Sequence, residues 1–249
     1  MESTEQKSKS PGRITDSHKH GRGDTGYSDL ALGQRISKGT SLPLNYWAFD
    51  ELQHSLSNFI EYNPCLIEEV DLQFMGFLLQ MTYCTNSVLY GACEPDWVDK
   101  FLFDSECLDF MINRISYFQE KEKEILGLDN IATEFIILKG YINRIRLKVR
   151  HVEIVWWSYR DLRRKHHIDK LAGMIERLDS HNEDPTLVKA ELDFYVDVVR
   201  NRFNHMGSIL NKCSSYYYWL ARYEHVKNGG SFEEWMSRAP KLSEFINEN

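Results

Sequence analysis

The sequence predicts an all-α protein, a five-helix bundle that carries an extra helical insertion. Apolar residues recur at alternating spacings of four and three in several long segments, which is the pattern of helices packed in a bundle. The period-two alternation that is typical of strands persists nowhere in the chain. Apolar residues make up 42% of the 249 residues, enough to fill a core.

Three helices are expected in the first half of the chain. The first runs from about residue 45 to 62 and ends at Asn63-Pro64, because the residue before a proline disfavours helical geometry. The third opens at Glu94-Pro95, where proline suits a first turn, and reaches about residue 124. The second spans about 66–90, and its apolar repeat consists of Val70, Phe74, Phe77, Met81, Cys84 and Val88.

Two further helices have the clearest apolar repeats. The repeat of the fourth helix consists of Ile131, Phe135, Leu138, Ile142, Ile145, Val149, Val152, Trp156 and Tyr159. The repeat of the fifth consists of Val199, Phe203, Met206, Leu210, Cys213, Tyr217 and Leu220. The fifth helix is expected to stop at residues 228–230, where two glycines can end it.

The domain organisation follows from these segments. Residues 1–22 are polar and are expected to form a mobile tail, residues 23–230 the bundle domain, and residues 231–249 a C-terminal tail. An insertion is expected at about 161–195, where a basic and then mixed-charge stretch is broken at SHNEDP. This insertion is predicted to hold one more helix and a loop, peripheral to the core.

Composition excludes several classes of function. The formal net charge is -7, which argues against a nucleic-acid partner because phosphate binding relies on excess positive charge. The five cysteines are scattered without a CxxC pair, so buried reduced thiols are expected rather than a metal site. No apolar run is long enough to span a membrane, and a cytoplasmic location is expected.

A glycine-rich segment precedes the first helix. It reads HGRGDTGYSDLALGQRISKGT, and Gly23, Gly26 and Gly33 allow sharp turns that bring backbone N–H groups near an anion. Ser28 and Lys38 could reach phosphate oxygens. The alternative is an ordinary glycine-rich loop, because the segment lacks the spacing of a P-loop.

A polar stripe flanks the apolar repeats of the last two predicted bundle helices. Arg146, Arg150 and Glu153 lie one position past the repeat of the fourth helix, and their spacing places them on one face. The fifth helix has a matching small polar stripe that could border the same cleft, made of Asn204, Gly207, Asn211 and Ser214. The alternative is a solvated charged face.

Other conspicuous residues are interpreted as structural. The aromatic run at residues 216–219 and the pair Trp156-Trp157 are expected to pack in the core or at interfaces. The pair His166-His167 is expected on an exposed basic face, since adjacent helical residues point about 100° apart and do not converge on a metal.

Three blocks, in this order, resemble the PduO-type ATP:cob(I)alamin adenosyltransferases. GRGDTGYS with GQRISK and AFDELQHSL is similar to the N-terminal motif of the family, and RLKVRHVE resembles its R-x-x-x-R-R-A-E. ILNKCSSYYYWLARYEHVKNG is similar to its L-N-R-L-S-D-Y-L-F-x-L-A-R-Y segment. Together the blocks span about residues 21–230. The resemblance implies a bundle of the cobalamin adenosyltransferase type.

The resemblance also implies roles for individual residues. Arg150 would neutralise phosphate charge, and Glu153 would help to hold the nucleotide or its magnesium. Asp50 and Arg146 would pair across a subunit boundary, close to the corrinoid. The residues implied in binding ATP are Gly23, Asp24, Gly26, Ser28, Lys38 and Asn211.

Several positions depart from the family motifs. His151 and Ile154 stand where the family has arginines, Lys212 and Ser215 where it has Arg and Asp, and Gly21 where it usually has lysine. The family places an aromatic loop residue beside the corrinoid. The nearest match is Phe135, although its place in the apolar repeat also suits core packing.

Three hypotheses follow. The first is a homotrimeric transferase that uses ATP with magnesium to adenosylate cob(I)alamin, at sites between subunits, releasing triphosphate. The second is a catalytically impaired homologue that binds a nucleotide or corrinoid or acts as a regulatory subunit, consistent with the changed motif positions. The third is a helical scaffold without a ligand.

Overall fold

The computed structural model describes residues 27–29, 35–89, 105–129, 140–198 and 204–230. These residues are almost entirely helical, which confirms the predicted all-α class. In chain order the elements are β1 (Tyr27–Asp29), β2 (Arg35–Ser37), α1 (Ser41–Tyr62), the short 3-10 helix η2 (Pro64–Leu66), α2 (Glu69–Leu89), α3 (Ser105–Leu126), α4 (Tyr141–Ser180), α5 (Thr186–Val198) and α6 (Asn204–Lys227).

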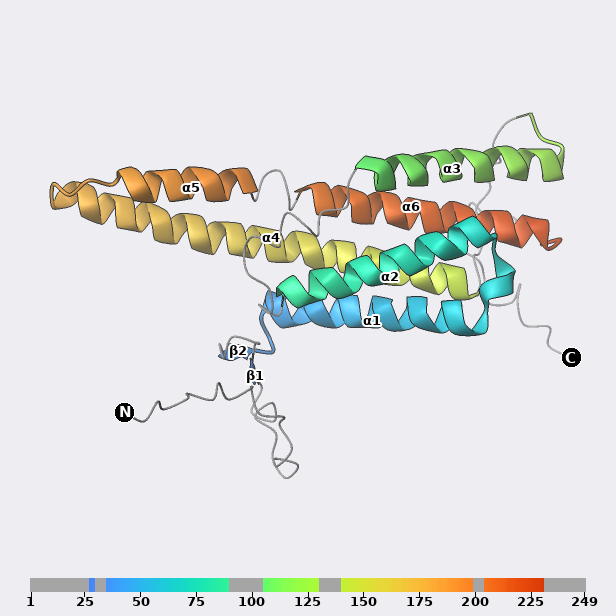
Figure 1. Cartoon of the computed structure of the whole chain (residues 1–249), viewed down its shortest axis with the longest axis horizontal. Helices are drawn as coiled ribbons and strands as arrows, with labels where there is room; N and C mark the ends of the chain where they lie inside the picture. Colours follow the sequence, from blue (N-terminus) through green and yellow to red (C-terminus); the bar gives the residue numbers. More distant parts are fainter. Residues whose placement is uncertain (1–26, 30–34, 90–104, 130–139, 199–203, 231–249) are drawn as a thin grey trace, which may run out of the picture.

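In the described part of the chain, α1, α2, α3, α4 and α6 pack as a bundle, and α5 lies outside it along the far end of α4 (Figure 1). The closest helix pairs are α2 with α1, α1 with α4, α4 with α6, and α6 with α3. Helix α4 therefore lies at the centre of this series. Helix α5 packs mainly against the far half of α4, away from the other helices.

Local sequence signals explain most helix ends. Helix α1 begins after Thr40 and ends where the Asn63 N–H bonds to the Phe59 carbonyl, directly before Pro64. Helix α6 ends at Lys227, and Gly229 two residues later has a φ of 76°, which favours glycine. Both ends agree with the sequence. The predicted starts of the third and fifth helices lie outside the described residues. The fourth helix was predicted to run unbroken from about Ile131, but α4 begins at Tyr141, because Gly140 before it has a φ of 97° and cannot continue a helix.

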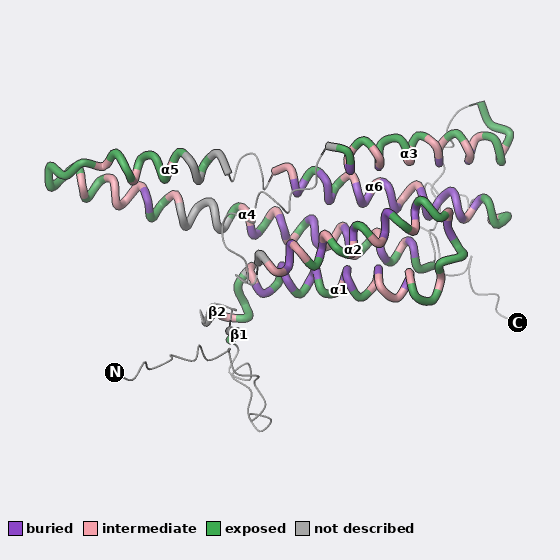
Figure 2. Tube along the Cα trace, viewed as in Figure 1, coloured by how far each residue is buried: buried purple, intermediate pink, exposed green. Residues whose placement is uncertain are grey.

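The core forms along the predicted apolar repeats of α4 and α6 (Figure 2). Every described member of both repeats is buried, which confirms these two predictions; the residues are Ile142, Ile145, Val149, Val152, Trp156, Tyr159, Met206, Leu210, Cys213, Tyr217 and Leu220. Over the described residues, no helix combines the length and the apolar character that crossing a membrane requires.

The predicted buried face of α2 is wrong by about one position. Val70 and Phe77 are 39% and 43% exposed, whereas Asp71 is fully buried. Apolar residues lie on several sides of this helix, so spacing alone did not define its inner face. The face of α2 that turns inward is determined instead by the contacts of Asp71 with Arg114 on α3 and Tyr216 on α6.

Helix α4 is longer than predicted. A separate helix was expected after about residue 160, yet α4 continues unbroken over 40 residues to Ser180. No proline interrupts this stretch, and a helix that leaves the bundle gains water on most sides, so its polar composition is compatible with continuation. The break at SHNEDP lies where predicted, and Asp184 caps α5 by accepting the Thr186 N–H at 2.9 Å.

A short hairpin precedes α1, where a loop was expected. Strands β1 and β2 pair antiparallel, with Tyr27 opposite Ser37 and Asp29 opposite Arg35. Each strand has three residues, too few for a period-two pattern to stand out in the sequence.

Buried ion pairs join α2 and α6 to α3. The Arg114 guanidinium donates to both carboxylate oxygens of Asp71 and to Glu68, and Tyr216 of α6 donates to the Asp71 carboxylate at 2.7 Å. Burial opposes the charge of Arg114, but these hydrogen bonds outweigh it and raise its pKa above the ordinary value. In a second ion pair, between Arg222 and Glu122, each side chain is 2% exposed.

Replacing Arg114 by methionine should strongly destabilise the protein. The change leaves the fully buried Asp71 carboxylate without its charged partner, and breaking a buried pair in this way costs about 3–5 kcal/mol. The matched control is Lys121→Met, because Lys121 forms an exposed ion pair with Glu124 and such pairs contribute little to stability. Urea unfolding of both variants measures the difference. Equal losses would contradict a structural role for the Asp71 pair.

Removing the arm formed by the end of α4 and by α5 should leave the bundle folded. The Arg160 guanidinium donates to Asn204 at 2.7 Å, so residues 160 and 204, which a short Gly-Ser linker would join, lie close together. We expect a single cooperative thermal transition and a helical spectrum reduced only by the deleted residues. Loss of cooperative melting would place the arm within the folding core.

Candidate functional site

Three of the predicted site residues, Arg150, Glu153 and Asn211, form a polar cluster between α4 and α6. One nitrogen of Arg150, Nη1, donates to Glu153 on the next turn of α4 and to the Asn211 side-chain oxygen at 3.1 Å. The Glu153 side chain is 10% exposed and that of Arg150 is 44% exposed. A nearly buried carboxylate thus fixes a guanidinium whose remaining N–H groups can reach solvent or a ligand.

Arg146 lies one turn before Arg150 on the same face. Its Nε donates to Asn143 at 2.7 Å, and its guanidinium lies 5.9 Å from the ring centre of Tyr218 on α6. Burial lowers the pKa of Arg146, and the positive charge of Arg150 lowers it further. Within the described residues Arg146 has no carboxylate partner, whereas Glu153 pairs with Arg150.

Asp50 lies on α1 and does not meet Arg146 within the chain. Its carboxylate accepts a hydrogen bond from Asn86 of α2. Asp50 is an exposed residue overall, yet partial burial raises the pKa of its carboxyl, and the Asn86 bond opposes that rise. Among the described residues no basic side chain pairs with it.

His151 faces α1 rather than the Arg150 cluster. Its ring packs edge-on against Trp47 at 5.8 Å between ring centres, and its Nδ1 lies 3.8 Å from the Glu51 carboxylate. Lys148 also pairs with Glu51. His151 therefore contacts α1, whereas Arg150 contacts α6.

The predicted phosphate loop is described only in part. Ser28 lies in β1, opposite Ile36 of β2, and Lys38 is exposed directly after β2. The backbone of the hairpin carries both residues to the start of α1. Four predicted site residues lie outside the described residues, namely Gly23, Asp24, Gly26 and Phe135.

The polar stripe extends farther along α4 than predicted. Trp157 and Arg160 continue the spacing of Arg146, Arg150 and Glu153 and contact α6. The spacing of four, three, four and three was visible in the sequence, but Trp157 was interpreted only as a packing residue. On α6, Gly207 contacts Trp157 and Asn204 contacts Arg160. Both α6 residues belong to the predicted polar stripe.

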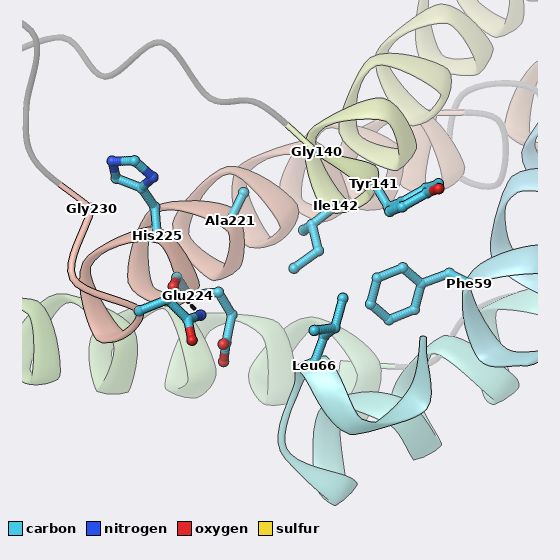
Figure 3. Close-up of a pocket in the computed structure, with 10 residues that line it drawn as sticks. Phe59, Leu66, Gly140, Tyr141, Ile142, Ala221, Glu224, His225 and Gly230 are labelled. Atoms are coloured by element: carbon cyan, nitrogen blue, oxygen red, sulfur yellow. Dashed lines mark hydrogen bonds between the residues drawn. The ribbon is translucent and has the colours of Figure 1, made fainter. Parts of the chain in front are cut away.

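A separate pocket of about 280 Å³ lies at the other end of the bundle (Figure 3). Phe59, Leu66 and Ile142 form an apolar side, and Glu224 lies across from them. Burial raises the pKa of Glu224, and its bond with Lys227 opposes this. None of the predicted site residues lines this pocket, so the pocket and the Arg150 cluster are distinct features.

No protein-family model and no curated protein sequence matches the chain. Two solved structures show a distant likeness, both of variants of a PduO-type ATP:corrinoid adenosyltransferase from Lactobacillus reuteri complexed with cobalamin and ATP. The first covers 88% of this chain and 97% of its own at 14% identity, the second 90% and 97% at 15% identity, each with a TM-score of 0.47. A likeness at this level defines neither a family nor an activity.

Proposed function

We propose that the protein is an ATP:cob(I)alamin adenosyltransferase whose nucleotide site includes Arg146, Arg150 and Asn211. In this reaction the electron pair of the cob(I)alamin cobalt attacks the 5′ carbon of ATP. A cobalt–carbon bond forms, the carbon–oxygen bond to the phosphate breaks, and triphosphate leaves. The chemistry therefore requires a site that stabilises the negative charge gathering on the leaving group.

The observation that carries the proposal is the charge balance of the α4–α6 cluster. Two partly buried guanidinium groups lie one turn apart, and one carboxylate, Glu153, is bound to the second of them. The mutual repulsion of Arg146 and Arg150 is relieved when an anion binds between them. Asn211 fixes the position of Arg150 from α6. A triphosphate has the charge that such a site favours.

Glu153 acts in this proposal by positioning Arg150. Its carboxylate is engaged by the guanidinium, which leaves little capacity for a metal ion. Magnesium binds through few carboxylates and through substrate phosphates, and the pair of Glu153 with Arg150 does not fit it. The role of Glu153 as a magnesium ligand is therefore set aside, and no step depends on it.

An exposed apolar face on α1 and α4 supports assembly into a homotrimer. Leu44, Trp47, Leu147 and Ile154 are each between 46% and 58% exposed. Large exposed apolar patches commonly mark protein interfaces. Asp50 and Arg146, each without an oppositely charged partner in the described part of its own chain, supply one acid and one base for contacts between copies.

A second candidate is a non-catalytic protein that binds a nucleotide or corrinoid. It is favoured by the two positions where the resembling family has arginines. His151 turns toward Trp47 and Glu51, and Ile154 is 58% exposed. The positive charge that α4 supplies beside the leaving group would then come from Arg146 and Arg150, which is enough to bind an anion without rapid turnover.

Replacing Arg150 by alanine should lower turnover more than ATP affinity. A preorganised group that stabilises developing charge contributes about 10²–10³ in rate, because it acts mainly in the transition state. The control is Arg144→Ala, an exposed arginine on the same helix whose guanidinium lies over Tyr141. Adenosylcobalamin formation from reduced cobalamin and ATP is followed spectroscopically. If the unmutated protein binds ATP but forms no product, the second candidate replaces the first.

A charge exchange tests the pairing of Asp50 and Arg146 between copies. Asp50→Arg and Arg146→Asp should each weaken assembly, and the double variant should partly restore it, because only the pair recovers the attraction. Sedimentation velocity at micromolar protein measures the trimer fraction. Additive losses in the double variant would reject the pair, and a monomeric unmutated protein would reject the trimer.

A further inference from the structure

The pocket at the end of the bundle lies where α1, η2 and the end of α6 meet the start of α4. Its volume of about 280 Å³ is close to the lower end of the range for small-molecule pockets, roughly 300–1,000 Å³. Most of its lining residues belong to packed helices. The pocket therefore has the size for a small ligand and walls that hold their positions.

One wall of the pocket is apolar. Phe59 and Ile142 belong to the buried core, and Leu66 beside them is 46% exposed. Figure 3 shows these three side chains together on one side of the pocket. A ligand with an apolar body would cover Leu66 and remove its surface from water, which favours binding.

The opposite wall carries the carboxyl group of Glu224 (Figure 3). Its side chain is only 8% exposed. Burial raises the pKa of the Glu224 carboxyl, and the negative charges of Glu68 and Asp71 add to this rise, whereas Lys227 opposes it. The ionised form of Glu224 is therefore poorly compensated, and a positive charge placed in the pocket would stabilise it.

Lys227 compensates Glu224 only in part. Its Nζ lies 3.2 Å from Oε1 of Glu224, longer than the roughly 2.7–2.9 Å of a strong bond between charged groups, and its side chain is 42% exposed. Within the described residues no donor bonds to Oε2 of Glu224. A carboxylate oxygen is thus available to a further donor, next to an apolar wall.

We propose that this pocket binds a small primary amine with an apolar body, whose ammonium group donates to Glu224. The apolar body lies against Phe59, Leu66 and Ile142. An anionic ligand would be repelled by the carboxylate, and an alcohol would form a weaker hydrogen bond because it carries no charge. The inference does not depend on the proposed function, since the pocket shares no residue with the Arg150 cluster.

The test compares phenethylamine with phenethyl alcohol, which has the same apolar body, by isothermal titration of the full-length protein. The unmutated protein should prefer the amine. Glu224→Gln should weaken amine binding about 10-fold to 100-fold, the range for a lost hydrogen bond to a charged group, and leave alcohol binding nearly unchanged. The matched control is Glu120→Gln, because Glu120 also pairs with a lysine three residues later but is 65% exposed. This control should change neither affinity.

Three further variants locate the ligand. Leu66→Ala, at an exposed position, should lower the affinity for both ligands and keep the preference for the amine. Lys227→Met removes the competing ammonium group and should raise the affinity for the amine, and Arg150→Ala should leave it unchanged. Equal binding of amine and alcohol by the unmutated protein would overturn the inference. So would amine binding that Glu224→Gln does not weaken, or affinities that Leu66→Ala does not change.

Discussion

The buried ion pair between Asp71 and Arg114 is the interaction on which the closed bundle depends. Helix α2 packs closely on α1, and α3 packs closely on α6, so these two outer helices are the ends of one series of neighbours. Asp71, Arg114 and Tyr216 join those ends, assisted by the stacked rings of Phe74 and Phe110 at 4.7 Å. A fully buried carboxylate is costly unless it is paired, so this arrangement specifies which faces of α2 and α3 meet.

The candidate site depends on the opposite side of the bundle, where α4 and α6 lie together. Their buried repeats fix the register of the two helices, and that register sets Arg150 opposite Asn211 and Trp157 opposite Gly207. Core packing of α4 against α6 therefore also fixes the position of the polar stripe. No loop has to become ordered to form this part of the site. Residues on packed helices hold their geometry more accurately than residues on loops, which suits a site that must recognise a long, charged ligand.

The sequence predicted those parts of the fold that depend on local patterns. The described members of the α4 and α6 repeats were predicted position by position. The meeting of Arg150 with Asn211 follows from two stripes that each lie one residue past a repeat. The inner face of α2 could not be predicted, because Asp71 is buried by a partner 43 residues later in the chain. The full length of α4 was also missed, since an exposed helix and a polar loop have similar compositions.

The continuity of α4 has a mechanical consequence. A single helix of 40 residues passes from the core, along the Arg150 and Trp157 stripe, into the arm that it shares with α5. An α-helix resists twisting and bending because its backbone hydrogen bonds link every turn to the next. A load on the arm, such as a bound macromolecule, would act through a stiff lever on the α4–α6 contact. The spacing between Arg150 and Asn211 is therefore the quantity that such a load would change.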